Sequence, residues 1–378
     1  MKENKNKNIK TTQISEIKNI KVHGRTTECL TPLTLFWTGS AVELNVMGTE
    51  LWIEVEADYD QYEPWISIII NSAPVSRQML TAGRYWICIF RGMSENVTKN
   101  VRIVKDTQAM SGDPGCTLQI HAVKSDGEFL PVEDKPYKIE FIGDSISSGE
   151  GAIGAKAEED WIPMWFSAIR NYCTMTAEAL DADYRIISQS GWGVLTSWDN
   201  NPHANIPDCY EKVCGLLTGE RNKSLGALND NNFTSWQPDV VVVNLGTNDT
   251  GAFYNQEWRD EVTGETHKQR LNEIGTFHEE DLHSFEAAVT NFLSKLRKYN
   301  KNSQIVWAYG MLDIPMMPDI YRAVDVYHKM TGDRKVSVFQ LPGTTEETFG
   351  ARSHPGLSAH QKAAKELSDY LKPLLSWK

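Results

Sequence analysis

The sequence predicts an α/β fold in which an all-β region precedes a parallel sheet covered by helices. Three observations predict it. Apolar residues recur with a period of two over residues 31–132, and after Pro136 apolar runs alternate with helical patterns. A charged segment with an Asp-Gly pair and two prolines, residues 125–136, separates the two regions. We therefore expect two domains, at residues 1–132 and 133–378.

The N-terminal region has the pattern of many short antiparallel strands. In one of them Leu51, Ile53 and Val55 fall on one face and glutamates fall on the other. Such runs at close spacing, with no convincing helix between them, predict a β-sandwich of the jelly-roll kind. The expected strands are residues 41–46, 51–57, 65–70, 85–90, 97–104 and 117–123.

Four tryptophans of this region leave two interpretations open. In a glycan-binding sandwich they would stack on sugar rings. In an ordinary domain they would be core or inter-domain residues, which is the commoner role of large aromatic side chains. The four are Trp37, Trp52, Trp65 and Trp86.

The C-terminal region alternates strands with helices, which predicts a parallel sheet in a three-layer α/β/α sandwich. Residues 239–245 hold four consecutive valines and are apolar on both faces, as a central parallel strand must be. Apolar residues at helical spacing predict a helix over residues 281–299. The last helix is expected to start at Ser358, with Gln361 completing a capping box, and to stop before Pro373. The expected strands are residues 137–142, 184–188, 239–245, 304–308 and 335–340.

Composition and charge narrow the possible partners. The 378-residue chain carries a net charge of −12, which argues against nucleic acid because phosphates would repel such a surface. The sequence has no run of about 18 apolar residues, so no membrane span is expected. Six scattered cysteines without a CxxC pair make a disulfide framework or zinc site improbable. The polar N-terminus lacks the apolar stretch of a secretory signal, so we expect a cytoplasmic protein unless a signal has been removed.

Four turns that follow strands carry chemically active residues. Right-handed crossovers place such turns at one edge of a parallel sheet. A hydroxyl, a Gly-bounded amide, a carboxamide and an imidazole would converge there, and this is the set that ester hydrolysis needs. The turns are Gly143-Asp144-Ser145, Gln189-Ser190-Gly191-Trp192-Gly193, Gly246-Thr247-Asn248-Asp249 and Ser353-His354-Pro355-Gly356.

In these four blocks the chain resembles the SGNH (GDSL-type) hydrolases, a superfamily with a flavodoxin-like three-layer domain. Ser145, Gly191, Asn248 and His354 each match one of the four motif residues, in the right order and after the right strands. A β-sandwich before such a domain, with Ser-Gly-Trp-Gly in the second block, resembles carbohydrate esterase family 2. That narrower resemblance implies removal of O-acetyl groups from plant cell-wall sugars such as xylan.

The resemblance assigns a role to each motif residue. Ser145 is the expected nucleophile and His354 the general base. The side-chain amide of Asn248 and the backbone N–H groups of Gly191 and Ser145 are the expected oxyanion donors. Trp192, beside Gly191, is the candidate wall of the acyl or sugar pocket. No metal and no organic cofactor is implied.

Other residues of the same types are assigned ordinary structural roles. Ser147 and Ser148 lie deeper in the first loop, and the motif does not select them. His360 falls inside the last helix, so packing is its expected role. His278 and His283 flank acidic residues without HExxH spacing, and we expect them on the surface.

The sequence departs from the superfamily at one place. Three residues before the His, where the superfamily usually has an Asp that orients the imidazole, this chain has Ala351. We expect a Ser-His dyad in which a backbone carbonyl holds the imidazole N–H. A carboxylate from elsewhere is the alternative, and Glu347 is its candidate.

The expected function is therefore that of a serine esterase that deacetylates O-acetylated xylan or other O-acetylated sugars through an acyl-enzyme. Two alternatives stay open: a thioesterase or lysophospholipase on the same fold, and a glycan-binding protein whose hydrolase domain is inactive. The sequence does not name the polysaccharide or the acetyl position. It leaves homo-oligomer formation open.

Overall fold

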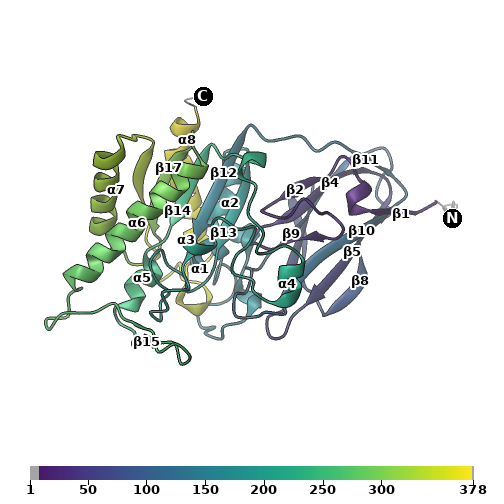
Figure 1. Cartoon of the computed structure of the whole chain (residues 1–378). Helices are drawn as coiled ribbons and strands as arrows, with labels where there is room; N and C mark the ends of the chain where they lie inside the picture. Colours follow the sequence, from purple (N-terminus) through teal and green to yellow (C-terminus); the bar gives the residue numbers. More distant parts are fainter. Residues whose placement is uncertain (1–7, 377–378) are drawn as a thin grey trace.

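A computed structural model describes residues 8–376, so the ends of the chain at 1–7 and 377–378 lie outside the described residues. The polar N-terminal segment that the sequence analysis considered therefore lies almost wholly outside the described residues. The purple and blue N-terminal strands lie on one side of the molecule, and the parallel sheet with its helices lies on the other (Figure 1). Within residues 8–376, no helix combines the length and the apolar character needed to cross a membrane.

The N-terminal strands form two antiparallel sheets. One has the order β1-β10-β5-β8 with β3 on β10, and the other has the order β11-β4-β9-β6-β7 with β2 on β4. The strands are β1 Lys10–Gln13, β2 Lys21–His23, β3 Leu33–Thr34, β4 Ala41–Met47, β5 Glu50–Asp58, β6 Trp65–Ile70, β7 Ala73–Met79, β8 Gly83–Arg91, β9 Lys99–Lys105, β10 Thr117–Ser125 and β11 Glu128–Leu130; a short 3₁₀ helix, η1 Ile14–Glu16, follows β1.

Alternating side chains join these two sheets into the arrangement of a β-sandwich. Leu51, Ile53 and Val55 of β5 are buried, as the period-two pattern predicts, and they share one core with residues of the facing sheet such as Leu44 and Ile103. The jelly-roll connectivity stays a prediction, and so does the domain division at residue 132.

The four tryptophans of this region do not share one environment. Trp37 is fully buried, belongs to the core of the parallel-sheet region and donates its indole N–H to the carbonyl of Val213 at 2.7 Å. The other three are half-buried, and each has a cationic side chain over its ring. They are Trp52 with Arg91, Trp65 with Arg77, and Trp86 with Lys124.

The C-terminal region contains a five-stranded parallel sheet with the order β13-β12-β14-β17-β18. Its strands are β12 Tyr137–Gly143, β13 Ala182–Ser188, β14 Val240–Asn244, β17 Gln304–Gly310 and β18 Val336–Leu341; a separate two-stranded hairpin pairs β15 Trp258–Arg259 with β16 Thr266–His267.

Helices cover both faces of this sheet, which gives the predicted three layers. Val241 and Val243 of β14 share one core with helices α6 and α7, whereas Val240 and Val242 share another with α2 and α8. The helices are α1 Ser145–Ser148, α2 Tyr172–Ala179, α3 Ile206–Cys209, α4 Glu220–Ser224, α5 Thr247–Ala252, α6 Glu279–Tyr299, α7 Met317–Thr331 and α8 Leu357–Leu375, with 3₁₀ turns η2 Pro163–Trp165, η3 Ala168–Arg170, η4 Phe233–Ser235 and η5 Ala351–Ser353.

The prediction for the last helix is wrong at both ends. Helix α8 is preceded by Gly356 as its N-cap, without a side-chain hydrogen bond, and it continues through Pro373 to Leu375. The missing N–H of Pro373 costs one hydrogen bond near the helix end. Leu371 and Leu375 are buried against the sheet on either side of this proline, and their burial holds the final turn in place.

Candidate active site

The loop after β12 presents Ser145 at the carboxyl end of the sheet, where ligands bind in open α/β folds. Asp144 is the N-cap of α1, and its Oδ1 accepts the N–H of Ile146 at 3.0 Å. Gly143 leaves no room for a side chain, because a Cβ there would lie 2.1 Å from the Oγ of Ser147. Only glycine fits at this position, and Ser145 follows two residues later with 6% of its surface exposed.

The structure brings His354 to this serine from 209 positions later in the chain. The Nε2 atom of His354 lies 2.9 Å from the Oγ of Ser145, which is hydrogen-bonding distance. The two loops that carry them are in close contact, since a Cβ on Gly151 would lie 2.6 Å from the Cβ of His354. A hydroxyl paired with a neutral imidazole nitrogen is the arrangement of an activated nucleophile and its base.

A backbone carbonyl holds the other nitrogen of the imidazole. The Nδ1 of His354 lies 2.6 Å from the carbonyl oxygen of Arg352, so Nδ1 carries the proton and Nε2 is left as the acceptor. Glu347, the alternative partner, is exposed and accepts a hydrogen bond from the hydroxyl of Thr345 instead. The sequence left open whether a backbone carbonyl or a carboxylate orients the imidazole, and in the structure it is the carbonyl of Arg352.

Asn248 and Gly191 lie in loops that are tied to the Ser145 loop. The Nδ2 of Asn248 donates to the carbonyl of Trp192 at 3.0 Å and to Oδ2 of Asp144 at 3.2 Å. Gly191 has a left-handed backbone with φ of 79°, and its carbonyl accepts the N–H of Trp198 at 3.0 Å. The carboxamide, the Gly191 loop and the nucleophile loop thus form one connected group.

Asp249 organises the second of these loops, a role that the sequence analysis did not assign. Its carboxylate accepts the backbone N–H groups of Val194, Leu195 and Thr196 at 2.8–3.2 Å. Gly193 allows the approach, because a Cβ there would lie 2.3 Å from Oδ2 of Asp249. Burial raises the pKa of Asp249, and the three N–H donors oppose that rise.

Glu150 is a second residue that the sequence analysis missed. Its side chain is 2% exposed, and its Oε2 lies 3.9 Å from the Nε2 of His354 and accepts the hydroxyl of Ser190 at 2.7 Å. Its Oε1 lies 3.5 Å from the Nε of Arg352. The carboxylate of Glu150 therefore lies within ion-pair distance of the imidazole. The signal in the sequence was a charged residue inside an otherwise small-residue loop, Ser-Ser-Gly-Glu-Gly.

The buried carboxyl of Asp144 titrates near neutrality. Burial raises its pKa to about 7, and the carboxylates of Asp249 and Glu150 add to the rise, while the N–H of Ile146 opposes it. Its observed contacts, to the N–H of Ile146 and to the amide of Asn248, are those of a brace for the loop.

Trp192 and Trp198 line an open cleft next to these loops. The cleft has a volume of ≈ 430 Å³, and Ser190 and Gly191 also line it. Trp192 is half-buried and packs against the core of the parallel-sheet region, whereas Trp198 is 51% exposed. Trp198 thus has the more accessible aromatic face, and the motif that points to Trp192 does not mark it.

The rival residues lie elsewhere. Ser147 and Ser148 are fully buried and hydrogen-bond Tyr172 and Ser188. His360 is buried on α8 and stacks on Tyr172, so its predicted packing role is confirmed. The other two histidines lie on or beside α6, His278 at its N-cap and His283 with 65% of its side chain exposed. Within residues 8–376, no group of three His, Cys, Asp or Glu side chains is placed to hold a metal ion.

Comparison with known proteins identifies the family of this chain. The profile of the GDSL-like lipase/acylhydrolase family matches residues 139–372, which is more than half of the chain. The protein belongs to the GDSL-like lipase/acylhydrolase family. The match begins in β12, the strand that precedes Ser145, and extends beyond His354 into α8.

Two solved structures and one curated relative are similar over nearly the whole chain. The acetyl xylan esterase Est2A of the rumen bacterium Butyrivibrio proteoclasticus is 48% identical, with a TM-score of 0.96 and coverage of 98% of this chain and 99% of that one. A family two carbohydrate esterase from Clostridium thermocellum, solved with cellohexaose, shares the fold at 24% identity and a TM-score of 0.78, covering 95% of this chain and all of that one (100%).

The curated relative is the cellulase/esterase CelE of Acetivibrio thermocellus, which is 26% identical over 348 residues. The match covers 90% of this chain but only 38% of CelE. This chain therefore spans well under half the length of that relative.

Proposed function

We propose that this GDSL-family protein is a serine esterase that removes O-acetyl groups from acetylated plant cell-wall polysaccharides or oligosaccharides of the xylan type. One observation carries the proposal: the 2.9 Å contact between the Ser145 hydroxyl and an imidazole nitrogen whose partner nitrogen is held by a carbonyl. The 48% identity to an acetyl xylan esterase over 98% of the chain supports the substrate class.

In the proposed reaction, Nε2 of His354 takes the proton of Ser145 as its Oγ attacks the acetyl carbonyl. The negative charge that develops on the carbonyl oxygen is stabilised by three hydrogen-bond donors: the backbone N–H groups of Ser145 and Gly191 and the side-chain amide of Asn248. When the tetrahedral intermediate collapses, the sugar alkoxide leaves and takes the proton from His354. Water then attacks the acetyl-enzyme with His354 again as base, and acetate is released.

Trp192 and Trp198 would bound the substrate on the side of Gly191. An indole against the oxyanion loop leaves space for a short acyl group, which favours acetyl over a long chain. The two rings line the same cleft, and the more exposed Trp198 offers a face to a sugar ring. Residues 1–132 are proposed as a separate sandwich domain and residues 133–378 as the catalytic domain.

The test is acetate release from acetylated xylan, acetylated mannan and short acetylated oligosaccharides. Ser145→Ala and His354→Ala should each lower kcat by about 10³-fold or more. Ser224→Ala, an exposed serine on α4, is the matched control and should match the wild type. A Ser145→Ala variant as active as the wild type would remove the nucleophile assignment.

Two further outcomes separate the alternatives. Faster hydrolysis of nitrophenyl octanoate than of nitrophenyl acetate would favour a thioesterase or lysophospholipase. Glycan binding without hydrolysis of any ester by the wild-type protein would favour a binding protein with an inactive site.

A further inference from the structure

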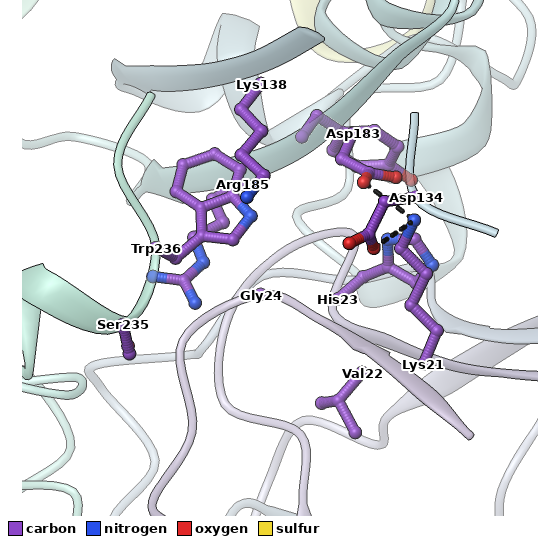
Figure 2. Close-up of a pocket in the computed structure, with 11 residues that line it drawn as sticks. Lys21, Val22, His23, Gly24, Asp134, Lys138, Asp183, Arg185, Ser235 and Trp236 are labelled. Carbon is purple, nitrogen blue, oxygen red and sulfur yellow. Dashed lines mark ion pairs between the residues drawn. The ribbon is translucent and has the colours of Figure 1, made fainter. Parts of the chain in front are cut away.

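A second cavity lies at the opposite edge of the parallel sheet from Ser145. It has a volume of ≈ 190 Å³ and is lined where β12 and β13 begin and where β2 of the N-terminal sheets passes (Figure 2). Lys138 lies near the start of β12, and Ser145 follows its end. At about 3.3 Å per strand residue, the seven residues from Lys138 to Ser145 put roughly 20 Å between this cavity and the proposed nucleophile. The cavity therefore does not belong to the esterase site.

Arg185 is the central cation of this cavity. Its guanidinium carbon lies 4.4 Å from the centre of the Trp236 ring, and Figure 2 shows the group beneath that indole. Within residues 8–376, the guanidinium of Arg185 makes no hydrogen bond and no ion pair, although the residue is half-buried. A guanidinium has five N–H donors, and stacking on an indole engages none of them, so these donors are free to bind an anion in the cavity.

The charges nearby do not balance Arg185. Glu140, which pairs with Arg185 across strands β12 and β13, accepts hydrogen bonds from Arg25 at 3.0 Å and from the hydroxyl of Tyr210 at 2.7 Å, so its carboxylate is already engaged. Burial lowers the pKa of Arg185 to about 10; Glu140 opposes that fall, and the positive charge of Arg25 adds to it. Two arginines face one carboxylate, which leaves one positive charge over.

The acidic residues of the cavity are likewise paired with other groups. Lys21 lies 2.7 Å from Asp183 and 3.2 Å from Asp134, and both contacts are drawn in Figure 2. Lys138, on the same side as Arg185 and Trp236, has no side-chain partner within the described part of the chain. The cavity thus has a neutralised half around Lys21 and a positive half around Arg185 and Lys138.

We propose that Arg185, Lys138 and Trp236 form a binding site for one small oxyanion, either a free phosphate-like ion or the carboxylate of a sugar acid. The planar fork of arginine matches the oxygens of a carboxylate or phosphate, and lysine adds a point charge. At ≈ 190 Å³ the cavity is smaller than the 300–1,000 Å³ of typical ligand pockets, which limits the occupant to an ion or a single sugar unit. The proposal goes beyond ester hydrolysis and does not depend on it.

The test is calorimetric titration of the whole chain at constant ionic strength with sodium phosphate, sodium glucuronate and neutral xylose. Saturable binding of phosphate, glucuronate or both, with none of xylose, is the expected result, and the stronger ligand identifies the source of the oxyanion. Arg185→Gln and Lys138→Gln should each weaken binding by about 10- to 100-fold, the value of a hydrogen bond to a charged group. Lys362→Gln, which removes an exposed cation of α8, is the matched control and should change affinity less than twofold.

Any of three results would overturn the proposal: no saturable anion binding by the wild type, anion binding by Arg185→Gln as strong as that of the wild type, or loss of anion binding in Ser145→Ala. The last would mean that the anion occupies the esterase site. If Arg185→Gln does not fold, Arg185→Lys keeps the charge and loses only the fork, and it should still weaken binding by about tenfold. Esterase activity is measured separately, so an inactive esterase that binds the anion would sink only the proposed function.

Discussion

The Nδ1 atom of His354 lies 2.6 Å from the carbonyl oxygen of Arg352, two residues earlier in the chain. Arg352 and Ser353 both adopt left-handed backbone angles, with φ of 61° and 51°, and this turn points the carbonyl back at the imidazole. A carbonyl fixes the tautomer but carries no formal charge. The nearby negative charge comes from Glu150, on the Nε2 side of the ring.

The first prediction concerns the backbone of Arg352. Arg352→Gly should keep kcat within about tenfold of the wild type, because glycine adopts positive φ freely and the carbonyl remains. Arg352→Val should lower kcat by a further 10- to 100-fold, because a β-branched residue resists this conformation at a cost of about 1–3 kcal/mol. Steady-state kinetics on nitrophenyl acetate measures both.

Both variants lose the contacts of the Arg352 side chain with the carbonyl of Glu159 and with the carboxylate of Glu150, so the difference between the two variants reports the backbone. Equal activities for the glycine and valine variants would show that the left-handed turn does not position the imidazole.

The second prediction concerns the charge of Glu150. Opposite charges about 4 Å apart attract by about 4 kcal/mol at an effective dielectric constant of 20, which is a ceiling for this pair. Glu150→Gln should therefore lower kcat by about 10- to 100-fold and leave KM nearly unchanged, because the charge acts on the imidazole when it is protonated in the transition state.

Glu347→Gln is the matched control, since it neutralises an exposed carboxylate bonded to Thr345. It should stay within twofold of the wild type. A rise in KM with unchanged kcat in Glu150→Gln would mean that Glu150 contacts the sugar instead of supporting the imidazole.

The third prediction tests the oxyanion role of Asn248. Asn248→Ala should lower kcat by about 10²–10³-fold with a small change in KM, as removal of one oxyanion donor does. The amide of Asn248 donates two hydrogen bonds in the structure, to Trp192 and to Asp144. The bond to Asp144 is the longer, at 3.2 Å, and the developing oxyanion would take the place of Asp144 as its acceptor. Asn302→Ala, an exposed loop residue, is the control. Loss of thermal stability that accounts for the whole loss of activity would argue for a structural role.

The fourth prediction concerns stability and pH. Burial lowers the pKa of His360 to about 3, and the charge of His354 adds to this. His360 therefore binds a proton near pH 6.5 in the unfolded chain but stays neutral in the folded protein at that pH. The contribution of neutral His360 to the free energy of unfolding is present above pH 6.5 and is lost as the pH falls toward 3. Between pH 6.5 and pH 5 the loss should be roughly 2 kcal/mol.

Urea unfolding at pH 7 and pH 5 measures this loss. His360→Asn can still accept the N–H of Tyr172, which His360 Nδ1 accepts at 3.1 Å, and it should remove most of the pH dependence. The control His283→Asn changes an exposed histidine and should keep the wild-type pH dependence. The same pH dependence in His360→Asn as in the wild type would contradict the prediction.

Much of the architecture could be predicted because it follows from local patterns. Alternation in β5 and the apolar run of β14 depend only on which faces of a strand meet a core. The position of Ser145 after β12 follows from the parallel sheet, in which strand ends share an edge. The error at Pro373 has the opposite origin: burial of Leu371 and Leu375 outweighs the local preference of proline.

Details of the candidate site were less predictable. The carboxylates of Glu150 and Asp249 act on residues that are distant in sequence, at His354 and at the 194–196 loop. The local pattern around Glu150 shows a charged residue among small ones, but it does not name the partner of either carboxylate. The carbonyl of Arg352 belongs to the backbone, which every residue shares, so its direction cannot be inferred from side-chain type.

By itself the sequence determined which residues could do the chemistry and in which order they follow the strands, because those facts depend on residue type and periodicity. Only the tertiary structure decided that the imidazole of His354 meets the hydroxyl of Ser145, that a carbonyl replaces the missing carboxylate, and that Arg185 has no carboxylate partner among residues 8–376. These are distances between atoms far apart in the chain, and long-range packing sets them.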